Sequence, residues 1–245
     1  MTIDFFWLGG TGFGSTPEAV SKAFADGLDR TRFTFHYLTY PAAYGHPLSY
    51  AESTIEGRRI LATAIRNTPN RVCIGGFSQG SGIAGDLAAE IAAGLHLDFE
   101  VDAVALIADP YRPAGAGMPG KHIAPGYGIG GERRIFGTHA MPVYWAANPG
   151  DVITAAGPGS PLRTLADLSQ WATLSSSQAT LAWGSDLINR AKAGRWQRFW
   201  SIENWQTWGG AARDAAGYLA GRHTTDYITL GYCRDLAAAV NRGVR

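Results

Sequence analysis

The pentapeptide Gly76-Phe77-Ser78-Gln79-Gly80 constrains this chain more than any other part of its sequence. It follows the apolar run 72–75 and opens a run of small and apolar residues, 81–90. A G-x-S-x-G turn between a strand and a helix is typical of a nucleophile elbow, a tight, strained turn that exposes its serine above a sheet. We therefore expect Ser78 to be a nucleophile. The alternative is a turn rich in glycine and serine that has no chemical role.

Short apolar runs alternate with helical stretches through the first half of the chain. The runs expected to be strands are residues 3–8, 33–38, 71–74, 101–108 and, after a long glycine-rich loop, 141–147. A helix is expected over 49–67, because Glu52 follows Ser49 at the spacing of a capping box. This alternation predicts an α/β fold with a mostly parallel central sheet flanked by helices. Ligand chemistry in such a fold lies at the carboxyl ends of the strands.

Composition excludes several classes of function. The 245 residues suit one large α/β domain over 1–245, and 21 basic residues balance 20 acidic ones without a run of either sign. A nucleic-acid partner is therefore not expected. No apolar stretch approaches the length of a membrane span and no basic region opens the chain, so we expect neither a transmembrane segment nor a signal peptide. Cys73 and Cys233 are expected to be free core thiols made in a reducing compartment.

The second half changes character after Asp151. Helix candidates at 163–174, 178–193 and 203–220 follow one another without strands, and 234–240 is a last helix. The segment 155–220 is expected to be a tryptophan-rich helical insertion before the base. Ordinary helix packing is one interpretation of its tryptophans, because tryptophan is normally buried. A lid or acyl-binding cap is the other. The tryptophans concerned are Trp171, Trp183, Trp196, Trp200, Trp205 and Trp208.

A serine nucleophile requires a base and a carboxylate that orients the base, and in hydrolases of this fold the chain order is serine, acid, histidine. Of the six histidines, His223 has the right order and lies in a loop after the last long helix. The others precede the serine, end the elbow helix, or lie in the glycine-rich loop or before a strand; they are His36, His46, His96, His122 and His139. His223 is the expected base.

Two aspartates compete for the role of the acid. Asp151 follows the fifth run and the turn Asn148-Pro149-Gly150, whereas Asp109 follows the fourth run and directly precedes Pro110. The position of Asp109 is typical of a residue whose side chain fixes a loop backbone. Asp151 is therefore favoured as the acid, and Asp109 remains the alternative.

The oxyanion hole is expected to combine the backbone N–H of Gln79 with a donor from the loop after the first strand. Thr11, in Gly9-Gly10-Thr11-Gly12, is the candidate. No register of this loop gives G-x-G-x-x-G and no G-K-[ST] follows, so a nucleotide site is disfavoured. Cysteine and histidine spacing offers no zinc pattern. No metal and no cofactor are predicted.

The order of four motifs along the chain resembles that of mycobacteriophage lysin B, and the resemblance covers nearly the whole chain. The motifs are Gly9-Gly10-Thr11-Gly12, the elbow at Ser78, Asn148-Pro149-Gly150-Asp151 and His223-Thr224-Thr225-Asp226-Tyr227. The S-Q-G elbow is shared with cutinases, but secreted cutinases usually pair cysteines near the serine and the acid. The resemblance implies a serine esterase that cleaves the ester between mycolic acids and arabinogalactan and helps release phage at lysis. It implies Ser78 as nucleophile, Asp151 as acid and His223 as base, with Thr11 and Gln79 lining the oxyanion hole.

The resemblance also sets expectations for context. We expect no N-terminal peptidoglycan-binding domain, since the first strand begins at Ile3. The protein would be made in the bacterial cytoplasm, act at the mycobacterial outer envelope, take a lipid ester as its partner and need no obligate protein partner. Two rival functions remain open: a cutinase-like or lipase-like carboxylesterase of a bacterial cell, and a non-catalytic relative that binds lipid or protein.

Overall fold

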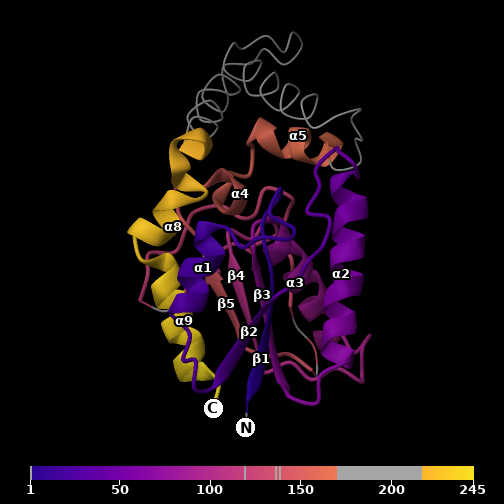
Figure 1. The fold of residues 1–245 in the computed structure, drawn as a ribbon. Helices are drawn as coiled ribbons and strands as arrows, with labels where there is room; N and C mark the ends of the chain where they lie inside the picture. Colours follow the sequence, from indigo (N-terminus) through magenta and orange to yellow (C-terminus); the bar gives the residue numbers. More distant parts are fainter. Residues whose placement is uncertain (1, 119, 136, 138, 170–216) are drawn as a thin grey trace, which may run out of the picture.

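Five parallel strands form the centre of the molecule. The computed structural model describes residues 2–169, apart from 119, 136 and 138, and residues 217–245 (Figure 1). The strand order is β2-β1-β3-β4-β5, and each neighbouring pair is parallel. The strands are β1 (Ile3–Leu8), β2 (Phe33–Tyr37), β3 (Arg71–Phe77), β4 (Ala103–Ile107) and β5 (Val143–Ala146). The predicted α/β fold with a parallel sheet is confirmed.

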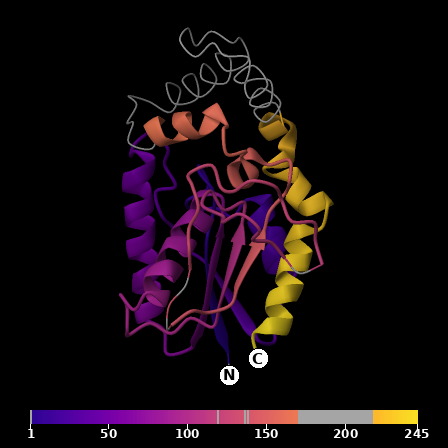
Figure 2. The same cartoon turned by 180° about the vertical axis from the view of Figure 1, so that it is seen from behind.

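Helices cover both faces of this sheet. On one side lie α2 (Tyr50–Arg66) and α3 (Gln79–Ala92), and on the other lie α1 (Ala19–Asp26) and α9 (Tyr232–Gly243), as Figures 1 and 2 show. Each pair of helices has its own apolar core against the sheet. Leu61 and Leu87 belong to the first core, and Phe24 and Leu236 belong to the second.

Strand β1 illustrates how the sequence divides between the two cores. All six of its residues are buried. Because side chains alternate along a strand, Phe5 and Trp7 point to the α1/α9 side while Phe6 and Leu8 point to the α2/α3 side. Trp7 stacks on Phe24 with ring centroids 4.4 Å apart. Apart from Asp4, the residues of β1 are apolar on both faces, as expected of a strand that is covered on both sides.

Helix α2 begins where its sequence predicts. The side chain of Ser49 accepts a hydrogen bond from the Glu52 backbone N–H at 3.2 Å, and Glu52 Oε2 accepts one from the Ser49 N–H at 2.9 Å. Both halves of the capping box are thus present, which satisfies two amides at the helix N-terminus. Helix α3 ends at Ala92, so His96 lies in the following loop rather than at the helix end.

After β5 the chain forms short helical segments. They are α4 (Val152–Ala155), α5 (Pro161–Ser169), the π-helical turn η1 (Tyr218–Arg222) and α8 (Thr225–Thr229). The expected helix at 163–174 overlaps α5. The one at 178–193, most of the one at 203–220, and all six tryptophans of the insertion lie outside the described residues.

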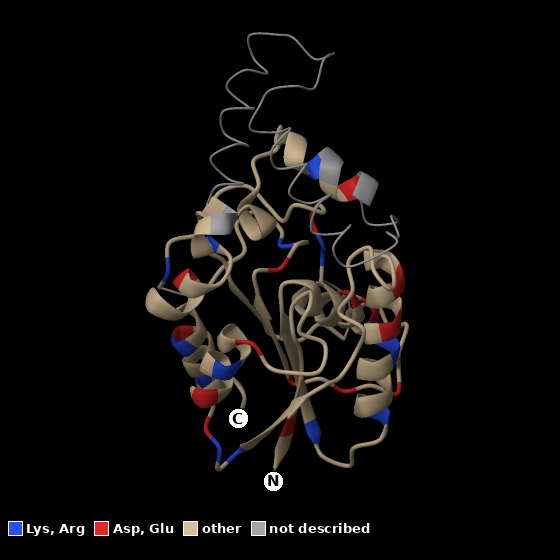
Figure 3. Cartoon of the chain, turned by 45° about the horizontal axis from the view of Figure 1, so that its top comes forward, with Lys and Arg blue, Asp and Glu red and all other residues tan. Residues whose placement is uncertain are grey.

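Surface charges are mixed in sign. In Figure 3 the flanking helices carry both basic and acidic residues, and neighbours such as Arg59 and Glu56 form ion pairs. Among the described residues, no helix is long and apolar enough to cross a membrane.

Candidate active site

Ser78 stands on a strained turn between β3 and α3. Its φ of 54° and ψ of −116° lie in a region that non-glycine residues rarely adopt. The glycines on either side are required by close backbone approaches. A Cβ on Gly76 would lie 2.3 Å from the carbonyl carbon of Gly80, and one on Gly80 would lie 2.1 Å from the carbonyl oxygen of Leu8. The pentapeptide therefore forms the sharp strand-turn-helix geometry of a nucleophile elbow.

The structure brings Ser78, His223 and Asp151 into one hydrogen-bonded chain. His223 Nε2 lies 2.8 Å from Ser78 Oγ, and His223 Nδ1 lies 2.9 Å from Asp151 Oδ2. His223 and Asp151 are buried. An ionised Asp151 accepts the Nδ1 proton, so Nε2 is the nitrogen that is left to take the serine proton. This arrangement is able to activate a hydroxyl for attack on a carbonyl carbon.

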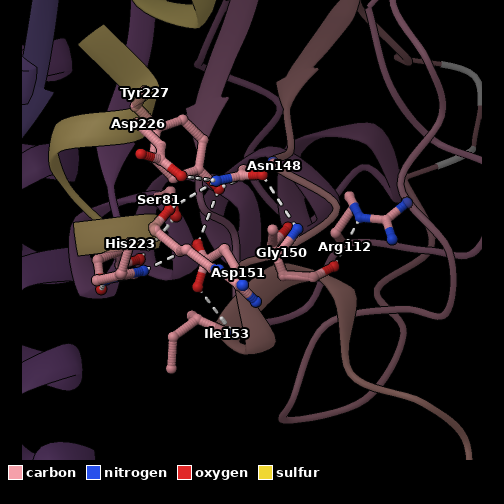
Figure 4. Close-up of polar contacts among 12 residues, drawn as sticks. Ser81, Arg112, Asn148, Gly150, Asp151, Ile153, His223, Asp226 and Tyr227 are labelled. Atoms are coloured by element: carbon pink, nitrogen blue, oxygen red, sulfur yellow. Dashed lines mark hydrogen bonds and ion pairs between the residues drawn. The ribbon is translucent and has the colours of Figure 1, made fainter. Parts of the chain in front are cut away.

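Asp151 is held by the turn that follows β5. Its Oδ1 accepts a hydrogen bond from the Ile153 N–H at 3.1 Å, which caps α4 (Figure 4). Asn148, three residues earlier, accepts the Gly150 N–H through its side-chain oxygen at 3.0 Å and donates its amide to the Arg222 carbonyl at 2.9 Å. Asn148 therefore ties the loop that carries the acid to the segment that carries the base.

Asp109 has different partners. It is fully buried and pairs with Arg133 Nη1 at 2.7 Å, and it also accepts the Trp145 indole N–H at 3.0 Å and the Tyr111 backbone N–H at 2.9 Å. These contacts pin the loop after β4. Of the two aspartates considered from the sequence, the structure places Asp151, and not Asp109, against the histidine.

The Gln79 side chain is part of the scaffold. It is buried, its Nε2 donates to the Ala43 carbonyl at 2.9 Å, and Tyr40 lies 3.3 Å from its Oε1. Its backbone N–H begins α3 and has no acceptor within the described part of the chain. The N–H of Ser78, by contrast, is bonded to the Ile107 carbonyl at 2.9 Å. The Gln79 amide is thus available to an oxyanion beside Ser78.

The loop after β1 lies next to the serine. A Cβ on Gly10 would lie 3.4 Å from the Cβ of Ser78, and the Gly9 carbonyl accepts bonds from the Gly80 N–H at 3.1 Å and from the Tyr40 hydroxyl at 2.7 Å. Thr11 is exposed on this loop. Its role as a second oxyanion donor stays a prediction.

Two buried arginines near the site were not predicted from the sequence. Arg133 donates to Asp86, Asp109 and the Gly82 carbonyl, so it joins α3 to the loop after β4. Within the described ranges, Arg112 forms no ion pair with a carboxylate, and desolvation lowers its pKa. It donates instead to the carbonyls of Pro113, Ala116, Ala124, Pro125, Gly126 and Thr154. Its 2.8 Å bond to the Thr154 carbonyl anchors α4 immediately after Asp151.

Two other histidines and the two cysteines have surroundings of their own outside this chain of three. His36 pairs with Asp4 at 2.9 Å and His96 with Glu90 at 3.0 Å. Burial raises the pKa of both Cys73 and Cys233 to about 12. In the described residues, no group of three or more histidine, cysteine or acidic side chains is placed to hold a metal ion.

Comparison with known proteins gives a structural relationship. No protein-family model and no curated protein matches the sequence. Among solved structures, lysin B from mycobacteriophage D29 matches with a TM-score of 0.56 at 17% identity, over 96% of this chain and all of that one. A cutinase-like protein from Cryptococcus sp. matches with a TM-score of 0.46 at 16% identity, over 71% of this chain and 97% of that one. The catalytic core of a Trichoderma reesei acetyl xylan esterase matches with a TM-score of 0.45 at 18% identity, over 69% and 95%.

The chain therefore has an α/β-hydrolase-type fold, in which Ser78, His223 and Asp151 form a serine-histidine-aspartate chain. Within that class, the chain is similar in fold to phage lysin B over nearly its whole length. The resemblance expected from the sequence motifs is confirmed at the level of the fold.

Proposed function

We propose that this chain is a serine ester hydrolase of the lysin B type, which cleaves the ester joining mycolic acids to arabinogalactan in the mycobacterial envelope. The observation that carries the esterase assignment is the 2.8 Å hydrogen bond between His223 Nε2 and Ser78 Oγ on the nucleophile elbow. The neighbouring Gln79 backbone N–H has no acceptor among the described residues, so it can bind an oxyanion. The mycolyl substrate is supported by the motif order and by the similarity of fold to lysin B.

The reaction has two halves. Ser78 Oγ attacks the ester carbonyl carbon while its proton passes to His223 Nε2, and the Gln79 N–H stabilises the negative oxygen. The C–O bond to the sugar breaks as His223 returns the proton to the leaving alcohol. Water then attacks the acyl carbon while His223 takes a proton from it. The bond from that carbon to Ser78 Oγ breaks, His223 returns the proton to Oγ, and the fatty acid leaves. The enzyme would act at the outer envelope, where its lipid ester substrate lies.

Fluorophosphonate labelling tests the nucleophile. The probe forms a covalent bond to an activated serine, so mass spectrometry of the labelled native protein should locate the adduct on Ser78 and on no other serine. Absence of labelling, or labelling elsewhere, would contradict the esterase assignment and favour a relative that only binds lipid or protein.

Hydrolysis assays test the substrate class. Purified mycolyl-arabinogalactan should release free mycolic acids, and long-chain p-nitrophenyl esters should be hydrolysed along with short ones. A protein that hydrolyses short esters and leaves mycolyl-arabinogalactan intact would be a cutinase-like carboxylesterase instead.

A further inference from the structure

Asp151 receives a hydrogen bond that the serine-histidine-aspartate chain itself does not require. The hydroxyl of Tyr227 donates to Asp151 Oδ2 at 2.8 Å, the same oxygen that accepts the His223 Nδ1 proton at 2.9 Å (Figure 4). The other carboxylate oxygen is bound by the Ile153 N–H. We propose that Tyr227 is a positioning residue, which fixes Oδ2 toward His223 and draws part of the negative charge away from the imidazole. This inference rests on the proposed esterase function.

The direction of the Tyr227 hydroxyl is set by a second contact. The Asn148 backbone N–H donates to the tyrosine oxygen at 3.1 Å, which occupies a lone pair and leaves the hydroxyl proton for Asp151. Tyr227 is fully buried. Burial first, and then the charge of Asp151, raises the pKa of Tyr227 well above its ordinary value. The phenol therefore remains a donor throughout the working pH range of an esterase.

The tyrosine ring is held by the elbow itself. Phe77, which precedes the nucleophile, lies with its ring centroid 5.0 Å from that of His223 and 6.4 Å from that of Tyr227. Tyr227 also lies only four residues after His223 in the chain, on α8. One short segment thus supplies both groups that contact Oδ2, and β3 supplies the surface against which both rings pack.

The consequence is electrostatic as well as geometric. A hydrogen bond stabilises the charged carboxylate and so weakens its attraction for a protonated imidazole. Without the hydroxyl, the imidazole should take up a proton at higher pH and the carboxylate should be less firmly oriented. In the described chain, the other titratable or charged side chains near these groups are Arg112, Arg222, Asp226 and Tyr232.

Tyr227→Phe tests this role, with Tyr232→Phe as the matched control. The Tyr232 ring lies 5.5 Å from that of Tyr227 and contacts Lys121, but in the described part of the chain Tyr232 makes no hydrogen bond to Asp151 or His223. For p-nitrophenyl butyrate, we expect Tyr227→Phe to move the acid limb of the kcat/KM profile upward by about half a pH unit or more. We expect kcat on the plateau to fall about three- to tenfold with little change in KM. Tyr232→Phe should leave the limb in place. A lowered Tm with an unmoved limb would show that Tyr227 only packs, and would overturn the proposal.

A second probe avoids the loss of the acceptor for the Asn148 amide. 3,5-Difluorotyrosine at position 227 keeps the hydroxyl but makes it a stronger donor, because fluorine acidifies the phenol. The acid limb should then move downward, opposite to its shift in Tyr227→Phe. No shift, or an upward one, would overturn the proposal. If the unsubstituted protein neither hydrolyses esters nor reacts with the fluorophosphonate at Ser78, the proposed function itself is refuted. If that protein is active and labelled but the acid limb of the pH profile is the same in the Tyr227 variants, only the role of Tyr227 is refuted.

Discussion

Asp151 Oδ2 lies 2.9 Å from His223 Nδ1, although 72 positions separate the two residues in the chain. The contact joins the loop after β5 to the end of η1, and so brackets the segment that includes the tryptophan-rich insertion. The bond from Asn148 to the Arg222 carbonyl fastens the same two loops a second time. The relative position of acid and base is therefore set by the ends of this segment, which meet beside the carboxyl edge of the sheet.

Ser78→Ala should abolish ester hydrolysis and leave the fold intact. The substitution removes one oxygen, and the neighbouring backbone contacts of Gly76 and Gly80 do not involve it. We expect kcat to fall by about 10⁴-fold or more, because the three groups act as a unit. The Tm should stay within about 3 °C of the parent. Steady-state kinetics within tenfold of the parent would rule out Ser78 as the nucleophile.

Asp151→Asn and Asp109→Asn should differ in kind. At Asp151 the amide favours the wrong imidazole tautomer, and we expect kcat to fall by about 10⁴-fold, as in serine proteases. At Asp109 the substitution leaves the buried Arg133 with Asp86 as its remaining charged partner among the described residues. We expect it to lower the free energy of unfolding by about 1–3 kcal/mol, because Arg133 loses one of its buried partners, and to spare single-turnover rates in folded protein. Chemical denaturation and rapid-quench kinetics on both variants separate the two effects. A stable, inactive Asp109→Asn beside an active Asp151→Asn would reverse the assignment of the acid.

Local signals in the sequence were sufficient for much of the scaffold. The run at 3–8 matches β1, and the Ser49/Glu52 pair matches the start of α2, because alternation and capping involve neighbours in the chain. Helix α1 was not predicted individually. It is only eight residues long and Glu18, at its N-cap, makes no side-chain capping bond. Its carboxylate binds Ser21 and Tyr37 instead.

Contacts between distant segments account for what the sequence did not reveal. Arg112 donates hydrogen bonds to backbone carbonyl oxygens of a loop with no regular structure. Backbone acceptors of this kind leave no pattern of side chains in the sequence from which they could be predicted. Tyr227 lies within the quoted motif His223-Thr224-Thr225-Asp226-Tyr227, but its bond to Asp151 depends on a turn 76 positions earlier. Asn148 carried a weak signal, since asparagine before Pro-Gly is typical of a side-chain-capped turn.

The two thiols should be inert in the folded protein. Burial raises the pKa of Cys73 and Cys233 to about 12, so the thiolate fraction at pH 8 is far below that of an ordinary cysteine. We expect iodoacetamide at pH 8 to leave both cysteines unmodified and hydrolysis unchanged, and to modify both in denaturant. Intact-mass spectrometry gives the count directly. Rapid modification of the native protein would show that one of them is accessible.

Activity should not require a metal ion. The proposed mechanism uses only Ser78, His223, Asp151 and backbone amides, so overnight treatment with EDTA should leave kcat/KM for p-nitrophenyl butyrate unchanged. The control is the same treatment followed by zinc or calcium. Loss of hydrolysis in EDTA that either ion restores would reveal a metal requirement.

Of the substitutions that add one methyl group to the elbow, Gly80→Ala should lower stability and activity the most. The new Cβ would lie 2.1 Å from the Leu8 carbonyl oxygen and 2.6 Å from that of Gly9, and both are backbone atoms of the strand and loop beside Ser78. Neither can move without shifting the loop that faces the nucleophile. We therefore expect a loss of about 2–3 kcal/mol in the free energy of unfolding, together with a fall in kcat. Gly157→Ala is the matched control, because its Cβ would meet nothing within 4 Å and its φ is not in the positive region. Urea denaturation and p-nitrophenyl ester kinetics should separate the pair, and equal stability of the two variants would show that the elbow tolerates a wider turn than this packing implies.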